Sequence, residues 1–266
     1  MKLSCISYSY HRSFANGSMT MESWIKECGR LKLDGVELLD MHFPETSQGY
    51  LAGIKKLCAE QFLTIAMVSA SGHFTMTDDA ERANQVAEMK NWIDVAAFMG
   101  APCVRFFIGS PAEIAEGGAK LYLKVIEAVR EVCDYAGERG IFMALENHGA
   151  CTADFILKLM LDVSHPWFKL NLDIGNFPLA GTPSEEAYRS IERCLPFAII
   201  IHGKFYKTDA GGEATDYDWD RILKMIYAVG FNGFISLEYE GESDDEVGQM
   251  EKIAGNLRRR LTGNRE

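Results

Sequence analysis

The feature that most constrains the fold is a strict alternation of short apolar runs with longer segments of helical periodicity. Eight runs have the apolar, β-branched and aromatic character of buried strands: 3–8, 35–39, 63–70, 103–109, 141–147, 168–174, 197–203 and 233–239. The clearest helical segments between them cover 21–31, 78–100 and 121–140. Gly100, Gly140 and Gly230 each follow a helix-like stretch and precede a strand-like run, as C-capping glycines do. Eight strands alternating with eight helices predict an all-parallel sheet.

The length of the chain narrows this prediction to one architecture. Within 266 residues we find no second zone of composition, no linker and no short internal repeat. We therefore predict an α/β fold with one domain, a single (β/α)8 TIM barrel over residues 1–266. A doubly wound open sheet is the rival, but no glycine-rich phosphate-binding fingerprint follows the first run.

Composition and charge limit the compartment and the partners. No run approaches the roughly 20 apolar residues that a membrane span needs, and the start of the chain lacks the apolar region of a signal peptide. The seven Cys are scattered without a CxxC pair, which indicates reduced thiols and a cytoplasmic protein. The net charge of −11 repels phosphate backbones, so neither nucleic acid nor a membrane is an expected partner. The sequence leaves open whether the chain forms a homo-oligomer.

Four residues with acidic or imidazole side chains end four successive strand-like runs: Glu146, Asp173, His202 and Glu238. A charged group that ends a buried strand is costly unless it is paired, hydrogen-bonded or bound to a metal. In a barrel all four would point into the same C-terminal mouth. Two Glu, one Asp and one His at one place indicate an oxygen-rich site for a divalent metal ion.

At these residues the chain resembles the xylose-isomerase-like TIM barrels, and more closely their sugar isomerase/epimerase branch. That branch includes ketose 3-epimerases, hydroxypyruvate isomerase and inosose dehydratase. In the family a Glu, an Asp, a His and a Glu end strands five to eight and together hold a divalent cation. The four residues of this chain match those roles one by one: Glu146, Asp173, His202 and Glu238.

The resemblance implies a divalent-metal-dependent isomerase or epimerase of a small sugar, polyol or keto acid. Proton transfer would pass through a metal-stabilised enediolate. By the same resemblance Glu146 and Glu238 form the catalytic acid/base pair, while Asp173 and His202 act mainly as ligands. The hard donor set favours Mn²⁺, with Mg²⁺, Co²⁺ and Zn²⁺ as alternatives.

Two positions depart from the ketose 3-epimerases. Asn176 stands where those enzymes have a His, three residues after the Asp of strand six, and Thr208 stands where they have an Arg, six residues after the His of strand seven. The sugar that this chain recognises is therefore expected to differ from theirs.

Five residues are candidates for contact with a small-molecule carbohydrate substrate: Glu37, Arg105, His148, Asn176 and Lys204. Arg105 could instead hold Glu146 or pair with Glu37, and His148 could cap its loop. We expect Glu240 to face away from Glu238 and to be solvated in an acidic loop.

Three other functions compete with the isomerase hypothesis. The first is a metal-dependent lyase or dehydratase on the same scaffold, because an enediolate can also expel a β-leaving group. The second is an endonuclease-IV-like phosphodiesterase, which six His in total and a net charge of −11 disfavour. The third is a non-catalytic barrel, which the complete set of four ligands argues against. The acidic loop EGESDDE, which begins at residue 240, favours an unphosphorylated substrate.

Overall fold

Eight parallel strands form the centre of the molecule in the computed structural model, which describes residues 1–149, 151–177 and 184–263. The strands pair in the order β1-β8-β7-β6-β5-β4-β3-β2, and a parallel bridge between Ile6 and Glu37 joins the two ends of the sheet. The bounds are β1 Lys2–Cys5, β2 Gly35–Leu39, β3 Thr64–Ser69, β4 Cys103–Phe106, β5 Phe142–Glu146, β6 Phe168–Asp173, β7 Ala198–Phe205 and β8 Phe234–Tyr239. The predicted (β/α)8 barrel is confirmed.

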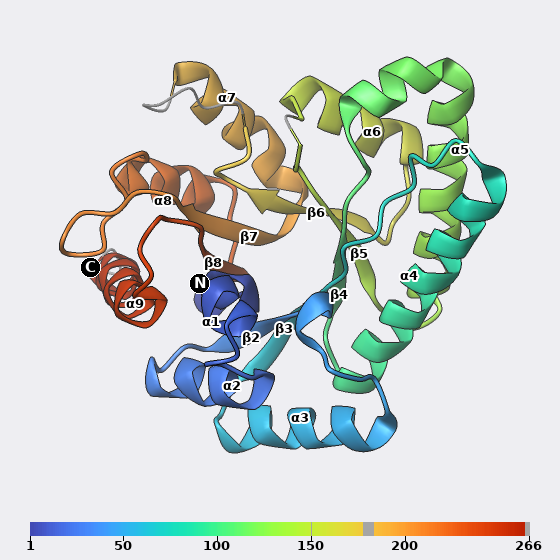
Figure 1. Cartoon of the computed structure of the whole chain (residues 1–266). Coiled ribbons are helices and arrows are strands. Elements are labelled where there is room, and N and C mark those ends of the chain that lie inside the picture. The colour runs from blue at the N-terminus through green and yellow to red at the C-terminus, as the bar shows by residue number, and fades with distance from the viewer. Residues whose placement is uncertain (150, 178–183, 264–266) are drawn as a thin grey trace.

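The helices surround the strands on the outside (Figure 1). In the described residues the α-helices are α1 His11–Ala15, α2 Met21–Arg30, α3 Gln48–Glu60, α4 Asp79–Met99, α5 Pro111–Gly137, α6 Ala153–Val163, α7 Glu185–Cys194, α8 Trp219–Ala228 and α9 Glu246–Gly263. Three 3₁₀ turns accompany them: η1 Ser7–Tyr10, η2 Asp40–His42 and η3 Leu195–Phe197. Each strand is followed by one helix, except that both α1 and α2 follow β1. None of these helices combines the length with the apolar character needed to cross a bilayer.

Capping residues explain why the helices end where they do. Gly100, Gly140 and Gly230 all have φ between +69° and +81°, which is the left-handed conformation that a C-capping glycine adopts at low cost. Ser110 accepts a hydrogen bond from the backbone amide of Glu113 and so begins α5, ten residues before the helical segment expected from the sequence. Gly118 departs from helical geometry inside α5, and this break hides the first part of the helix from a periodicity analysis.

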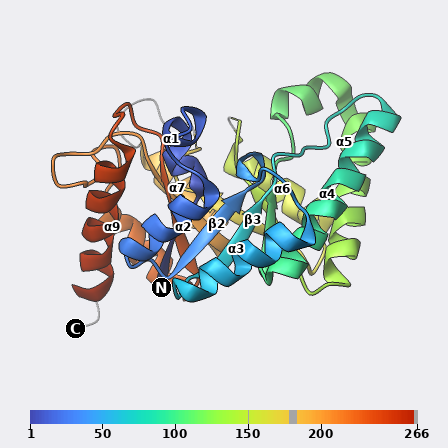
Figure 2. The same ribbon diagram turned by 60° about the horizontal axis from the view of Figure 1, so that its bottom comes forward.

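The strand register sets the site at one edge of the sheet. Glu146 pairs in register with Asn171, Asp173 with His202, and Lys204 with Glu238. These residues lie at the carboxyl ends of β5 to β8, so parallel pairing brings all of their side chains to the same mouth. In Figure 2, α1 lies on the opposite side of the molecule from the N-terminus, that is, on the side of the mouth.

Candidate metal centre and active site

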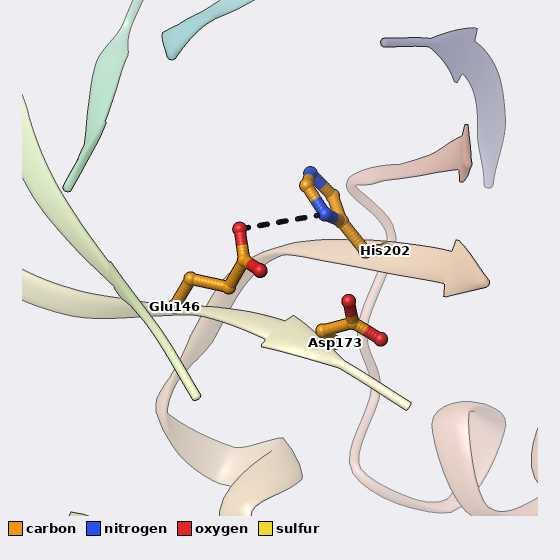
Figure 3. Close-up of side chains that lie close together, drawn as sticks. All are labelled: Glu146, Asp173 and His202. Atoms are coloured by element: carbon orange, nitrogen blue, oxygen red, sulfur yellow. Dashed lines mark ion pairs between the residues drawn. The ribbon is translucent and has the colours of Figure 1, made fainter. Parts of the chain in front are cut away.

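Three of the four predicted ligands converge from neighbouring strands, as Figure 3 shows for Glu146, Asp173 and His202. One donor atom from each of the three lies within 4.8 Å of the others, and all three residues are buried. The Glu146 Oε2 atom is 3.7 Å from Nδ1 of His202. Glu238 lies beside this group, because its Oε2 atom is 3.0 Å from the same Nδ1. Glu146, Asp173 and His202 are thus placed where one ion could contact all three.

The charges at this point fit a divalent cation. Among the described residues, Asp173 Oδ2, His202 Nδ1 and Glu238 Oε2 are buried without a hydrogen bond of regular geometry. Their close neighbours are each other and Lys204 Nζ, which lies within 3.0 Å of both carboxylate oxygens. Several buried carboxylates around one imidazole carry excess negative charge, which a bound cation would offset. Carboxylate and imidazole donors of this kind suit Mn²⁺, Mg²⁺ or Co²⁺.

Glu37 contacts the Nε2 edge of the His202 ring. Its Nε2 atom lies 3.0 Å from both carboxylate oxygens of Glu37, which also accepts a hydrogen bond from Ser69. Burial alone would lower the pKa of His202, but the carboxylates of Glu37 and Glu238 raise that pKa well above its usual value. Burial alone would raise the pKa of Glu37. The charge of His202 and its hydrogen bond to Glu37 nevertheless hold the pKa of Glu37 below its ordinary value.

Glu37 therefore occupies a different position from the one that substrate contact requires. Its side chain is fully buried, it does not line the cavity described below, and it pairs with His202 rather than with Arg105. We give it a role in orienting the imidazole, in place of substrate contact. The sequence indicates only that Glu37 is a charged residue within the strand-like run 35–39. Which charged side chain it faces across the barrel depends on the closed sheet.

Lys204 is the central cation of the site. Its Nζ atom lies 2.9 Å from Asp173 Oδ2, 3.0 Å from Glu238 Oε2 and 2.8 Å from Glu240 Oε1. Burial by itself would lower the pKa of Lys204, but these carboxylates raise it well above the ordinary value. Burial raises the pKa of Asp173 to about 7, because the nearby charges of Glu238 and Glu146 offset the favourable charge of Lys204.

The expectation for Glu240 is wrong. Lys204 contacts both Glu238 and Glu240, so the two carboxylates point to the same side. Residues two apart on a strand share a face, and Glu240 continues the strand geometry just beyond the end of β8.

Both carboxylate oxygens of Glu146 are held by donors. Arg105 Nη1 donates to Oε2 at 3.0 Å, Asn176 Nδ2 donates to Oε1 at 3.1 Å, and Asn171 Nδ2 donates to Oε2 at 3.3 Å. Arg105 thus takes the Glu146-holding role among its alternatives. Asn171 was not expected from the sequence. The available signal was a polar residue inside an apolar run, two positions before Asp173 and hence on the same face.

A cavity of about 270 Å³ opens above these residues. Its charged lining comprises Arg105, Glu146, Lys204, Glu238 and Glu240. Its largely apolar lining comprises Ile6, Tyr8, Leu39, Met41 and Phe107. His148 also lines the cavity, and its ring packs against Phe107 with 4.8 Å between the centroids. A lining of this mixed kind can contact both the carbon atoms and the oxygen atoms of a small polyhydroxy compound.

A family model and solved structures both resemble this chain. The model described as "Xylose isomerase-like TIM barrel" matches residues 23–260. The structure of D-psicose 3-epimerase with D-tagatose from Clostridium cellulolyticum H10 has a TM-score of 0.79 at 15% identity, covering 98% of this chain and 99% of that one. A probable 3-DHS dehydratase from Bacillus anthracis has a TM-score of 0.73 at 18% identity, with 100% of both chains covered. A xylose isomerase-like TIM barrel protein from Mycobacterium smegmatis, in complex with magnesium, has a TM-score of 0.72 at 19% identity and covers 98% and 97%.

Curated relatives match over shorter stretches. The alpha subunit of a 3'-dehydrocarminate deglycosidase from Microbacterium sp is 32% identical over 72 residues, which is 26% of this chain and 21% of that protein. The alpha subunit of a C-glycoside deglycosidase from Microbacterium trichothecenolyticum is 30% identical over 95 residues, which is 36% of this chain and 25% of that protein. The matched stretches span about a fifth to a quarter of these relatives.

Proposed function

The chain belongs to the xylose isomerase-like TIM-barrel family, and from this premise we propose that it is a divalent-metal-dependent enzyme that isomerises or epimerises a small sugar, polyol or keto acid. One observation carries the proposal. Glu146 and Glu238, from strands that are not neighbours, both line the same small cavity and both lie near Nδ1 of His202. Two carboxylates that face one bound carbon centre can remove a proton and return one.

The metal would be held by Glu146, Asp173, His202 and Glu238. When bound, the cation would act as a Lewis acid that stabilises negative charge on the substrate oxygens. Mn²⁺ is the ion that we propose, with Mg²⁺, Co²⁺ and Zn²⁺ as alternatives. The burial of these four side chains and their excess of negative charge support this assignment.

The remaining chemistry belongs to the side chains of this protein. Arg105 and Asn176 fix the Glu146 carboxylate from two directions, and Lys204 fixes Glu238. Fixed carboxylates lose little entropy when a substrate arrives, which favours proton transfer in a defined geometry. The site residues are buried, which limits the access of water to the exchanged proton. The apolar residues of the cavity lining restrict the orientation in which the substrate can bind.

Proton exchange provides the test. A panel of ketoses and keto acids is incubated with the Mn²⁺-loaded protein in D₂O, and deuterium at the carbon next to the carbonyl is measured by NMR. Exchange without loss of water is expected. Glu146→Gln and Glu238→Gln should each abolish exchange while retaining some bound metal, because the amide keeps an oxygen ligand but cannot carry the proton. Glu192→Gln, at an exposed position on α7, is the matched control.

His202→Ala should behave differently. We propose the imidazole as a ligand and not as a proton carrier, so its loss should act through metal affinity and be rescued in part by excess Mn²⁺. An active Glu238→Gln protein, or exchange that needs no metal, would contradict the proposal.

A lyase is the second candidate. The deglycosidase names of the curated relatives and the dehydratase among the similar structures favour it. The same base could remove the proton next to the carbonyl while the bond to a leaving group on the adjacent carbon breaks. The D₂O experiment separates the two functions, because a lyase releases water or another leaving group from the substrate and an isomerase does not.

A further inference from the structure

A second cavity of about 620 Å³ adjoins the reaction cavity. It lies between the chain that follows β7 and the chain that follows β8. Its lining from the first segment comprises Tyr206, Lys207, Thr208 and Thr215, and its lining from the second includes Glu242, Ser243 and Gln249. None of these residues has a role in the mechanism proposed above.

Glu240 lines both cavities and so connects them. Its carboxylate is held by Lys204, whose ammonium group also contacts Glu238 in the reaction cavity. Tyr206 provides a second connection, because its hydroxyl lies 3.4 Å from Asn176 Oδ1 and Asn176 in turn donates to Glu146. A group joined to a sugar in the reaction cavity would have to pass the side chain of Glu240 to reach the second cavity.

The second cavity is larger than the reaction cavity, and a monosaccharide substrate would not fill both. A space of about 270 Å³ suits a single sugar ring, whereas the larger space beside it would stay empty with such a substrate. We propose that the substrate carries a second group, joined to its carbonyl sugar, and that this group binds in the second cavity. The inference rests on the proposed function and specifies the substrate class of that same site.

The chemistry of the lining specifies the second group as polar and uncharged. Thr208, Thr215 and Ser243 offer hydroxyl groups, and Gln249 offers an amide. Two carboxylates and one ammonium group leave the lining negative, which disfavours a phosphate or a carboxylate in the ligand. A further sugar ring and a hydroxylated aromatic aglycone share the required chemistry. The printed names of the curated relatives, which concern glycosides, agree with a substrate of this kind.

Binding of paired ligands tests the inference without any need for turnover. Dissociation constants are measured by calorimetry on the Mn²⁺-loaded protein for fructose against maltulose, and for glucose against 3-O-(4-hydroxybenzyl)glucose. Both two-ring ligands keep a free carbonyl group; the first adds a second sugar and the second adds a hydroxylated aromatic ring. At least one two-ring ligand is expected to bind tenfold or more tightly than its one-ring partner. Which pair shows the gain identifies the second group.

Thr215→Trp narrows the second cavity from an exposed position, and Thr215→Phe does so with a smaller ring. In both variants the ratio of the two dissociation constants should fall to near one. Thr262→Trp, also at an exposed threonine but on α9 and away from the cavity lining, should keep the wild-type ratio. A wild-type ratio near one in both pairs, or a ratio that Thr215→Trp leaves unchanged, overturns the inference. Failure of the proposed function would instead show as a protein that binds these ligands but neither takes up metal nor exchanges deuterium.

Discussion

At the scale of single residues, the orientation of His202 depends on Glu37. The carboxylate holds Nε2 at 3.0 Å and leaves Nδ1 directed at the carboxylates of Glu146 and Glu238. Partners of this kind fix the ring and increase its basicity as a ligand. Glu37→Gln should weaken Mn²⁺ affinity by roughly 10- to 100-fold, the range typical for loss of such a partner. Calorimetric titration of the metal-free protein measures this, with Glu192→Gln as the control. Unchanged affinity would remove the orienting role of Glu37.

Lys204 balances the charges of the site when no metal is bound. It is 2% exposed and contacts three carboxylates, two of which are predicted ligands. Lys204→Met should therefore lower the free energy of unfolding of the metal-free protein by roughly 3 kcal/mol, because buried carboxylates lose their partner. Mn²⁺ should recover part of that loss and should raise the melting temperature more in the variant than in the wild type. Equal shifts in both proteins would show that Lys204 does not share charge with the metal site.

The positions of the four proposed ligands at the mouth could be predicted because each is a charged or imidazole group at the end of an apolar run, and such a group needs a partner. The partners themselves could not be predicted in the same way. Glu37 reaches His202 only because the sheet closes on itself, and Lys204 collects carboxylates from β6 and β8 through register. The expected orientation of Glu240 was wrong for a different reason. Residues two apart on a strand share a face, so the sequence alone already predicts that Glu240 faces the same side as Glu238.

At the scale of elements, His42 in η2 contacts both α1 and η1. Its ring in η2 stacks on Phe14 of α1 with 3.8 Å between centroids, and its Nδ1 atom lies 2.8 Å from the hydroxyl of Ser7 in η1. Burial lowers the pKa of His42 from 6.5 to about 4. The unfolded chain therefore takes up this proton at a higher pH than the folded chain does. Stability from this residue is complete above pH 6.5 and is lost as the pH falls from 6.5 to about 4.

His42→Asn removes the titrating group and should flatten this part of the pH profile. Urea midpoints at pH 7 and pH 5 are compared in both proteins. The wild type should lose more stability between the two values than the variant, and the difference isolates His42 from the other titrating groups. Equal losses of stability between pH 7 and pH 5 in the wild type and the variant would contradict the lowered pKa of His42.

Elements were easier to predict than their ends. The range 35–39 coincides with β2, and the ranges for the other strands overlap with the observed bounds, because a buried parallel strand is apolar along its whole length. Helix α1 was not expected, since its five residues are too few to show helical periodicity. Its position depends on a long-range contact instead. The buried carboxylate of Glu246, at the start of α9, accepts hydrogen bonds from the amides of Arg12 and Ser13.

At the scale of the whole molecule, charge should select the substrate. The chain carries −11, and within the described part five carboxylates surround the site: Glu37, Glu146, Asp173, Glu238 and Glu240. Arg105 and Lys204 supply two positive charges next to them, and a divalent ion would supply two more. With His202 neutral as a metal ligand, the site then keeps one negative charge. A sugar phosphate would bring further negative charge into this space.

Uncharged sugars should therefore have a kcat/KM at least tenfold higher than the matched sugar phosphates, a difference of about 1.4 kcal/mol in activation free energy. Because part of this discrimination comes from exposed charges of the whole chain, it should become smaller when the salt concentration rises from 0.05 M to 0.5 M, where screening shortens the reach of those charges. The part that remains at high salt measures the buried carboxylates at the site. A tenfold preference for the phosphate form would show that Arg105 and Lys204 act together as a phosphate clamp, and it would reverse the assignment of the substrate class.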